Sequence, residues 1–330
     1  MKMKKLTGFM LVFPVILAII FSGCNQGKTP DDKPSIVCTI FPQYDWVRQI
    51  LGDRADDFNV ILLLNSRIDL HNYQPSVDDI IKISACDIFI YVGGESDAWT
   101  DNVLKNAVNP DMIVINLLDA LGNAAKFSEL VEGMETGDHH HDDDDLQDHD
   151  ESEYDEHIWL SLRNAIMLSS VIADAISSLD GKNAEKYQNN LAAYVQELSV
   201  LDAEYQRAVN TSSGNTLLFG DRFPFRYLMD DYGLHYYAVF SGCSAETEAS
   251  FETIIFLVRK ADELNLINIM VTESSDQSIA KTIIASASGG NQRILALDSM
   301  QSVTPGDVQS GVTYISIMES NLSVLKEALR

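Results

Sequence analysis

Short apolar runs alternate with helical patterns along most of the chain. The runs are rich in β-branched residues and predict strands at 35–41, 58–64, 88–92, 112–115, 216–219, 236–240, 267–272 and 294–297. Between them, apolar residues recur every three or four positions and predict helices at 46–51, 77–83, 164–179, 223–232, 248–264 and 278–288. Strands that alternate with helices form parallel sheets covered by helices, so both halves of the chain are expected to be α/β.

One longer helix is predicted between the two halves, over 183–210. Its apolar residues step by three or four positions and form one face: Tyr187, Leu191, Tyr194, Leu198, Leu201 and Tyr205. At 1.5 Å per residue such a helix is about 40 Å long. The expected fold is therefore α/β, with two α/β lobes whose sheets are of parallel type, at 35–182 and 211–330. One long, rigid backbone helix joins the lobes and should limit their closure to small motions.

The first segment, 1–24, is expected to be an address rather than part of the fold. Three lysines precede an apolar stretch that is too short for a stable membrane span, and small residues lead into Cys24. This order resembles a bacterial lipoprotein signal peptide, which predicts lipidation of Cys24 and attachment to the outer face of the cytoplasmic membrane. Residues 25–34 would then be a flexible leash. The alternative is an ordinary signal peptide with an incidental cysteine.

The composition of the chain argues against nucleic acid as a partner, because 49 acidic residues face 23 basic ones, a net charge of −26. Thirteen of the acids lie in 132–156, which has four histidines and neither Lys nor Arg. Such a run is expected to be a disordered loop. Imidazole and carboxylate together predict weak capture of metal ions by His139, His140, His141 and His149, whereas a merely solvated acidic linker is the alternative. Deleting 132–156 is predicted to leave a tight site intact.

Two further histidines are candidate metal ligands in the folded part. His71 follows a predicted strand and precedes a helix start, and ligands of open α/β sheets bind at such carboxyl ends. His157 directly follows the acidic run. His235 has no comparable setting and is expected to be structural or at the surface. Cys38 and Cys86 are either bridged or two buried thiols, and the odd cysteine count leaves one thiol over.

An ordered set of motifs resembles the zinc/manganese substrate-binding lipoproteins of bacterial ABC transporters, the cluster that includes the high-affinity zinc-binding proteins. These motifs are TIFPQYDWVRQILGD (39–53), LHNYQPSVDDI (70–80), DIFIYVGGESDAW (87–99), EHIWLSLRNA (156–165), YGL (232–234), SGCSAETEASFETI (241–254), VTESS (271–275) and LALDSM (295–300). The resemblance covers nearly all of the mature chain. A His/Asp-rich loop before the second metal histidine is typical of zinc-preferring members.

The resemblance implies one metal ion held between the lobes, with His71, His157 and Asp298 as ligands. The position of the third family ligand is occupied by Arg222, which cannot ligate because it stays protonated. Asp221 beside it is a candidate replacement, with Arg222 then a residue of the outer shell. The alternatives are Glu246, Glu248 or Glu273, or a site completed by water.

The implied function is extracytoplasmic capture of Zn²⁺ and its delivery to an ABC permease in the membrane, by a monomer. Mn²⁺ is the alternative cargo, and a role as a surface adhesin could coexist with transport. An enzyme is not expected, because the sequence has no HExxH, GxSxG or P-loop motif.

Overall fold

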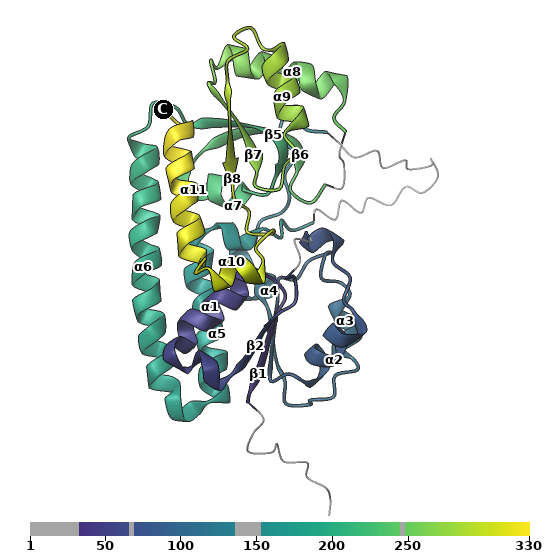
Figure 1. The fold of residues 1–330 in the computed structure, drawn as a ribbon, viewed down its shortest axis with the longest axis vertical. Helices are drawn as coiled ribbons and strands as arrows, with labels where there is room; N and C mark the ends of the chain where they lie inside the picture. The colour runs from purple at the N-terminus through teal and green to yellow at the C-terminus, as the bar shows by residue number, and fades with distance from the viewer. Residues whose placement is uncertain (1–32, 66–68, 136–152, 245–247) are drawn as a thin grey trace, which may run out of the picture. The chain divides into compact units, whose positions relative to one another are not determined.

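Two four-stranded parallel sheets form the framework of the computed structural model, which describes residues 33–65, 69–135, 153–244 and 248–330. The first sheet has the order β2-β1-β3-β4 and consists of β1 (Ser35–Cys38), β2 (Asn59–Leu62), β3 (Ile88–Tyr91) and β4 (Ile113–Asn116). The central strand β1 pairs in parallel with β2 and β3, so that Val37 lies opposite Ile61 and Phe89. Around this sheet lie α1 (Phe41–Leu51), α2 (Val77–Ala85), α3 (Thr100–Leu104) and α4 (Leu117–Leu121) (Figure 1).

The second sheet has the order β6-β5-β7-β8, again with parallel pairing throughout. Its strands are β5 (Thr216–Phe223), β6 (His235–Ser241), β7 (Asn268–Thr272) and β8 (Arg293–Leu297). The helices that follow them are α7 (Arg226–Tyr232), α8 (Phe251–Glu263) and α9 (Ser278–Ser286). The predicted strands of both halves are thus confirmed as two α/β sheets, with shifts of a few residues at their ends.

Strand β5 is longer than its apolar run predicts, because it continues from Phe219 through a bulge to Phe223. The predicted helix at 223–232 starts later, at Arg226, since Pro224 follows the strand. The extension places Asp221 and Arg222 in a strand rather than in a loop.

The long linking helix is confirmed as α6 (Ala184–Asn210), one residue shorter than predicted. Beside it lie α5 (Leu162–Leu179) and the C-terminal α11 (Tyr314–Ala328), which follows the short α10 (Pro305–Gln309) (Figure 1). The pattern analysis did not predict α11. Among the described helices, α5 alone is long and apolar enough to cross a membrane, and here half of its residues are buried against neighbouring helices.

Short 3₁₀ helices complete the described chain: η1 (Gly52–Asp57), η2 (Leu70–Asn72), η3 (Gly122–Ala124), η4 (Ile158–Leu160) and η5 (Gly181–Asn183). Two of them, η2 and η4, carry or adjoin His71 and His157.

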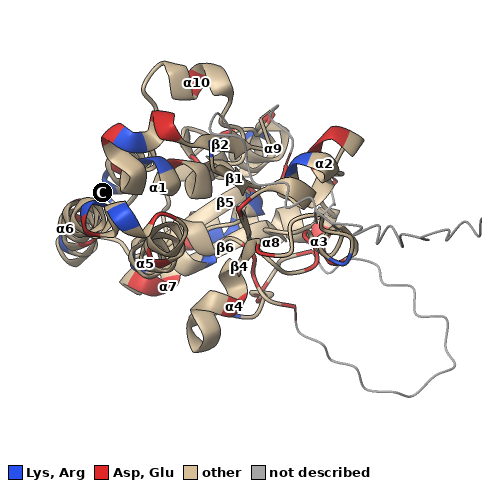
Figure 2. Cartoon of the chain, turned by 90° about the horizontal axis from the view of Figure 1, so that it is seen from below, with Lys and Arg blue, Asp and Glu red and all other residues tan. Residues whose placement is uncertain are grey.

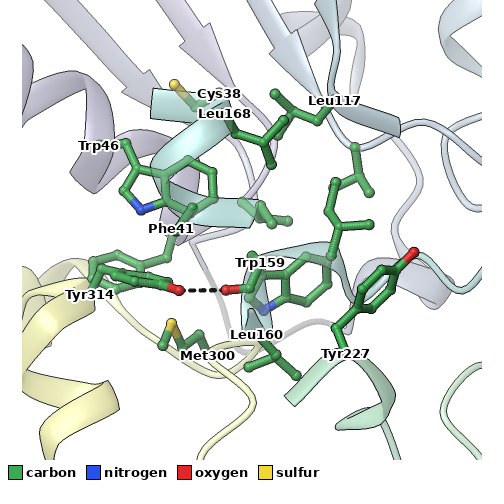
Figure 3. Close-up of a cluster of buried hydrophobic side chains, with 14 of the residues drawn as sticks. Cys38, Phe41, Trp46, Leu117, Trp159, Leu160, Leu168, Tyr227, Met300 and Tyr314 are labelled. Atoms are coloured by element: carbon green, nitrogen blue, oxygen red, sulfur yellow. Dashed lines mark hydrogen bonds between the residues drawn. The ribbon is translucent and has the colours of Figure 1, made fainter. Parts of the chain in front are cut away.

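A single buried cluster contains side chains from both sheets and from α1, α5, α6 and α11. Its centre lies around Trp159, whose indole Nε1 donates a hydrogen bond to the carbonyl oxygen of Ser299, at 2.9 Å. The hydroxyl of Tyr314 donates to the carbonyl oxygen of Trp159 at 2.7 Å (Figure 3). The backbone N–H of Tyr314 in turn donates to Asp45 of α1, at 3.0 Å. The C-terminal segment therefore joins the two halves, instead of belonging to one lobe alone.

Acidic and basic residues occur together on several helices of the described chain (Figure 2). On α2, for example, Lys82 lies 2.5 Å from Asp78 and 3.8 Å from Asp79. Such exposed pairs stabilise a helix by only a few tenths of a kcal/mol. Part of the negative charge is thus paired locally on the folded surface.

Cys38 and Cys86 are both buried and are not joined by a disulfide, so the second of the two alternatives for them holds. The Sγ of Cys86 donates to the carbonyl oxygen of Ile83 and lies 3.5 Å from the sulfur of Met112. His235 is exposed at the start of β6, as expected of a surface residue.

Candidate metal centre

His71 lies in η2, beyond the carboxyl end of β2, with its side chain 12% exposed. The turn is fixed by Asp69, whose carboxylate caps η2 and accepts from the backbone N–H of His71 at 3.0 Å. The ring nitrogen Nδ1 lies 2.7 Å from Oγ of Ser96 and 3.4 Å from Oε2 of Glu156. These partners orient the imidazole so that its Nε2 faces His157.

His157 is fully buried at the beginning of η4. One oxygen of Asp155 accepts from the backbone N–H of His157 at 2.9 Å and lies 3.0 Å from its Nδ1. The carboxylate therefore favours the tautomer that carries its proton on Nδ1 and keeps the lone pair on Nε2. This arrangement of carboxylate and imidazole is common behind metal-ligating histidines.

The Nε2 atoms of His71 and His157 lie 3.2 Å apart. Two nitrogens bound to one tetrahedral zinc ion at about 2.0–2.1 Å are separated by roughly 3.3–3.4 Å. The structure thus already holds the two imidazoles at the spacing of a shared zinc ion. Burial, and next the neighbouring His157, lower the pKa of His71 to about 4. His71 is therefore neutral at pH 7, the state that ligation requires.

Cys243 is the third potential ligand of this group. It follows β6, is half-buried, and its Sγ lies within 4.8 Å of one ring nitrogen of His71 and one of His157. Burial raises the pKa of its thiol, and the charges of Asp155 and Glu156 raise it further. No role is predicted for Cys243 from the sequence. The available signal was its position directly after a predicted strand, at the same kind of strand end as His71.

Gly242 allows the chain before Cys243 to pass against the ring of His157. A Cβ at this position would lie 2.7 Å from Cε1 of His157 and 2.9 Å from the carbonyl oxygen of Phe223. No larger residue fits without displacing the imidazole. The chain that follows β6 therefore contacts His157 through the backbone of Gly242, which has no side chain.

Glu156 is buried and its Oε1 accepts from the backbone N–H of Ser96, at 2.8 Å. Burial raises the pKa of this carboxyl, whereas the hydrogen bonds from Ser96 lower it. Gly94, with a φ of +81°, approaches the same carboxyl so closely that a Cβ would lie 2.3 Å from Oε1. Both its φ and this contact require glycine at position 94.

Residues 132–135 and 153–156, the two ends of the predicted loop, have defined positions, and 136–152 lie outside the described residues. Tyr154 forms a bridge with Phe127, and the backbone of Asp155 donates to Lys126 at 2.8 Å. The composition of the run concealed this, since Asp155 and Glu156 are buried as partners of the histidines rather than solvated. The candidate capture residues His139, His140, His141 and His149 lie outside the described residues, as do Cys24 and Glu246.

The structure does not bring Asp221 to the histidines. One of its oxygens accepts from the N–H and hydroxyl of Thr272 on β7, at 3.1 and 2.8 Å, and the other accepts from the N–H of Arg222 at 2.8 Å. The guanidinium of Arg222 lies 3.3 Å from Asp69, the residue that caps the turn of His71. Arg222 thus pairs with the residue that caps the turn of His71, and it lines the same cavity as His71 and Cys243.

Asp298 lies after β8, where its carboxylate accepts from the N–H of Met300 at 2.7 Å. Burial, and then the charge of Glu273, raise its pKa to about 6. Both carboxylates line a cavity that does not include the histidines, and Glu273 is bound to Ser299 at 2.8 Å and Ser302 at 3.1 Å. Glu248 is exposed. Ligation by Asp221 or Asp298 therefore stays a prediction.

Asp97 lies beneath Ser96 and provides a test of the site's electrostatics. Its carboxylate is 1% exposed and accepts from the N–H groups of Val92 and Gly93, at 2.8 and 3.1 Å. Burial raises its pKa to about 7, above the ordinary ~3.9 of the unfolded chain. Its contribution to stability is therefore fully present below about pH 4 and is lost as the pH rises to 7.

Asp97→Asn removes this titration. Between about pH 5 and pH 8, the free energy of unfolding of the zinc-free variant should rise relative to wild type by roughly 1–3 kcal/mol. Urea unfolding at the two pH values measures the shift. Asp111→Asn, at an exposed position, is the matched control and should show no such change. A difference that is independent of pH for Asp97→Asn would contradict the prediction.

The family described as zinc-uptake complex component A, periplasmic, matches residues 36–328. The zinc-binding lipoprotein AdcA of Streptococcus pneumoniae is 30% identical over 325 residues, which are 98% of this chain and 61% of AdcA. The high-affinity zinc uptake system protein ZnuA of Bacillus subtilis is 28% identical over 330 residues, covering 99% and 98% of the two chains.

Two solved structures share the fold. The Zn(II)-bound ZnuA-like domain of S. pneumoniae AdcA has a TM-score of 0.68 and 28% identity, covering 90% of this chain and 99% of the domain. The metal-dependent lipoprotein YcdH of B. subtilis has a TM-score of 0.70 and 26% identity, with coverage of 90% and 99%.

The family match covers both sheets, the long helix and the two facing imidazoles of His71 and His157. The chain belongs to the zinc-uptake complex component A family. It spans about three fifths of the length of the streptococcal AdcA relatives. The resemblance found in the sequence is confirmed.

Proposed function

We propose that the protein captures Zn²⁺ outside the cytoplasmic membrane and delivers it to an ABC permease. The observation that carries this proposal is the pair of Nε2 atoms, 3.2 Å apart, that His71 and His157 direct at each other. Family membership and the zinc-binding names of the relatives support it. Two imidazoles are donors that suit zinc better than manganese, which prefers oxygen ligands, so Mn²⁺ is the second candidate.

Zinc binding is proposed to be accompanied by a change in the tautomer of His71. In the zinc-free protein His71 can donate its single proton through Nε2 to His157, with the hydroxyl of Ser96 donating to Nδ1. Zinc binding at Nε2 would require that proton to move to Nδ1 of His71, which then becomes the N–H donor. Ser96 and the buried Oε2 of Glu156 are in place to accept from it. Asp155 serves His157 in the same way in both states.

Ligands from the second half would place the metal between the two lobes. Asp298 is a proposed ligand that would have to leave its bond to Met300, and Arg222 is proposed to act through Asp69 on the turn of His71. Lipidation at Cys24 would hold a monomer at the membrane surface near the permease. The acidic run, with its four histidines, would collect metal weakly close to the tight site.

Titration of the full chain with Zn²⁺ against a chromophoric chelator tests this function. We expect one tight site plus weak ones, with Mn²⁺ competing poorly. Deleting 136–152 should remove the weak sites and leave the tight one, because Asp155 and Glu156 are retained behind the histidines. Deleting 132–156 is the matched comparison. The sequence alone predicts that this deletion leaves the tight site intact, but it also removes Asp155 and Glu156, which contact the two histidines, so we now expect it to damage the tight site. A full chain without tight zinc binding would refute the proposed function.

A further inference from the structure

We propose that the thiolate of Cys243 is a third ligand of the zinc ion, together with the Nε2 atoms of His71 and His157. The inference rests on the proposed function, because it names a donor at the same site. The observation that carries it is the cluster, in which Sγ of Cys243 and one nitrogen of each imidazole lie within 4.8 Å of one another. It is the one group of three or more such donors at this spacing among the described residues.

The second sheet fixes the backbone that carries this thiol. Strand β6 pairs with β5 up to its last residue, Ser241, which lies opposite Phe223. The next residue, Gly242, is buried and packs directly against the ring of His157. Cys243 thus starts from a position that is held against a ligand by both strand pairing and close packing.

The distance to be closed is small. In a tetrahedral zinc site with Zn–N of about 2.05 Å and Zn–S of about 2.3 Å, sulfur and nitrogen are roughly 3.5–3.6 Å apart. From a separation of no more than 4.8 Å, Sγ of Cys243 therefore has to approach the imidazole nitrogens by roughly 1.3 Å at most. Rotation about χ1 of a half-buried side chain moves sulfur by this amount without moving the backbone.

Neighbouring side chains of the second sheet are committed elsewhere. Arg222 is permanently protonated and forms an ion pair with Asp69, at 3.3 Å. Asp221 uses both oxygens on Thr272 and on the backbone of position 222. Among these described residues of the second half, Cys243 is the one whose potential ligand atom lies within 4.8 Å of the histidine nitrogens.

Binding breaks the S–H bond of Cys243 and forms a Zn–S bond. The electron pair of S–H stays on sulfur, and the proton leaves to bulk water. A thiolate is a soft ligand that favours zinc, whereas manganese favours carboxylate oxygen. Cys243 would therefore determine specificity as well as affinity.

Cobalt substitution tests the assignment directly. With one equivalent of Co²⁺, the full chain should show a thiolate-to-cobalt charge-transfer band in the near ultraviolet. All proteins carry Cys24→Ser, so that no second accessible thiol binds cobalt. Cys243→Ser should lose the band while it keeps visible ligand-field bands from the imidazoles. Cys86→Ala removes a buried thiol far from this cluster and should keep the band.

Zinc affinity gives an independent readout. Cys243→Ser should weaken binding by at least the ~10–100-fold that outer-shell partners cost. Cys243→Asp should restore binding with a selectivity shifted towards Mn²⁺. Cobalt bound tightly by the Cys24→Ser chain without the band, or a band that persists when Cys243→Ser is added, would overturn the ligand assignment alone. Absence of tight binding in the wild-type chain would instead refute the proposed function, and this inference with it.

Discussion

His157→Ala should abolish tight zinc binding. It removes one of two nitrogens that lie 3.2 Å apart, and it leaves the buried carboxylate of Asp155 without its imidazole. The loss should exceed the ~10–100-fold typical of changes behind a ligand. Asp155→Asn, which keeps an acceptor but removes its charge, should fall within that range. Equilibrium competition with a chelator measures both variants, and His71→Ala should match His157→Ala.

His235→Ala is the matched control for the histidine variants. This imidazole is exposed at the start of β6, at the end of the strand opposite to the site. Its removal should leave zinc affinity unchanged. Urea unfolding of each variant separates loss of ligation from loss of the fold. Wild-type affinity in a folded His157→Ala protein would remove that residue from the ligand set.

Trp159→Ala should lower the free energy of unfolding by about 3–5 kcal/mol. The indole is 1% exposed and fills the middle of the cluster drawn in Figure 3, among side chains that include Phe41, Leu168 and Tyr227. Truncation leaves a cavity and removes the hydrogen bond to Ser299. Its ring centroid also lies 5.4 Å from that of His157, so zinc binding should weaken as well.

Denaturant unfolding of zinc-free protein measures this loss without a contribution from the metal. Val200→Ala, at a position of α6 that is 56% exposed, should change stability by less than ~0.5 kcal/mol. Trp159→Phe should fall between the two, because it keeps an aromatic ring but not the N–H donor. Equal stability of the Trp159→Ala and Val200→Ala proteins would show that the core can collapse around the missing indole.

Local patterns predicted most of the fold, because buried strands and amphipathic helices leave a periodic signal. The strand β5 shows where that signal ends. Its apolar run stops at Phe219, but the chain stays extended since Asp221 binds Thr272 on the neighbouring strand. Such a contact, between residues far apart in sequence, has no periodicity. The helix α11 likewise takes its place through contacts of Tyr314 with Asp45 and Trp159.

The sequence predicts individual candidate residues of the site but not how they are arranged in space. His71 and His157 could be chosen as candidates from their positions along the chain, but their 3.2 Å separation depends on folding across 86 residues. Asp155 and Glu156 are predicted to be part of the solvated acidic run, because the sequence does not distinguish a buried carboxylate from a solvated one. Cys243 was overlooked because it has no neighbouring cysteine, and its partners are histidines of the other half.

The continuous core that extends from β1 to α11 also bears on how quickly cargo can leave. Separating the halves would expose this apolar interior to water, at a cost that rises with the area uncovered. We therefore expect the residence time of the ion to depend on loosening of the short segments around His71, His157 and Cys243. A permease that accelerates release would need to act on these segments rather than force the whole protein apart.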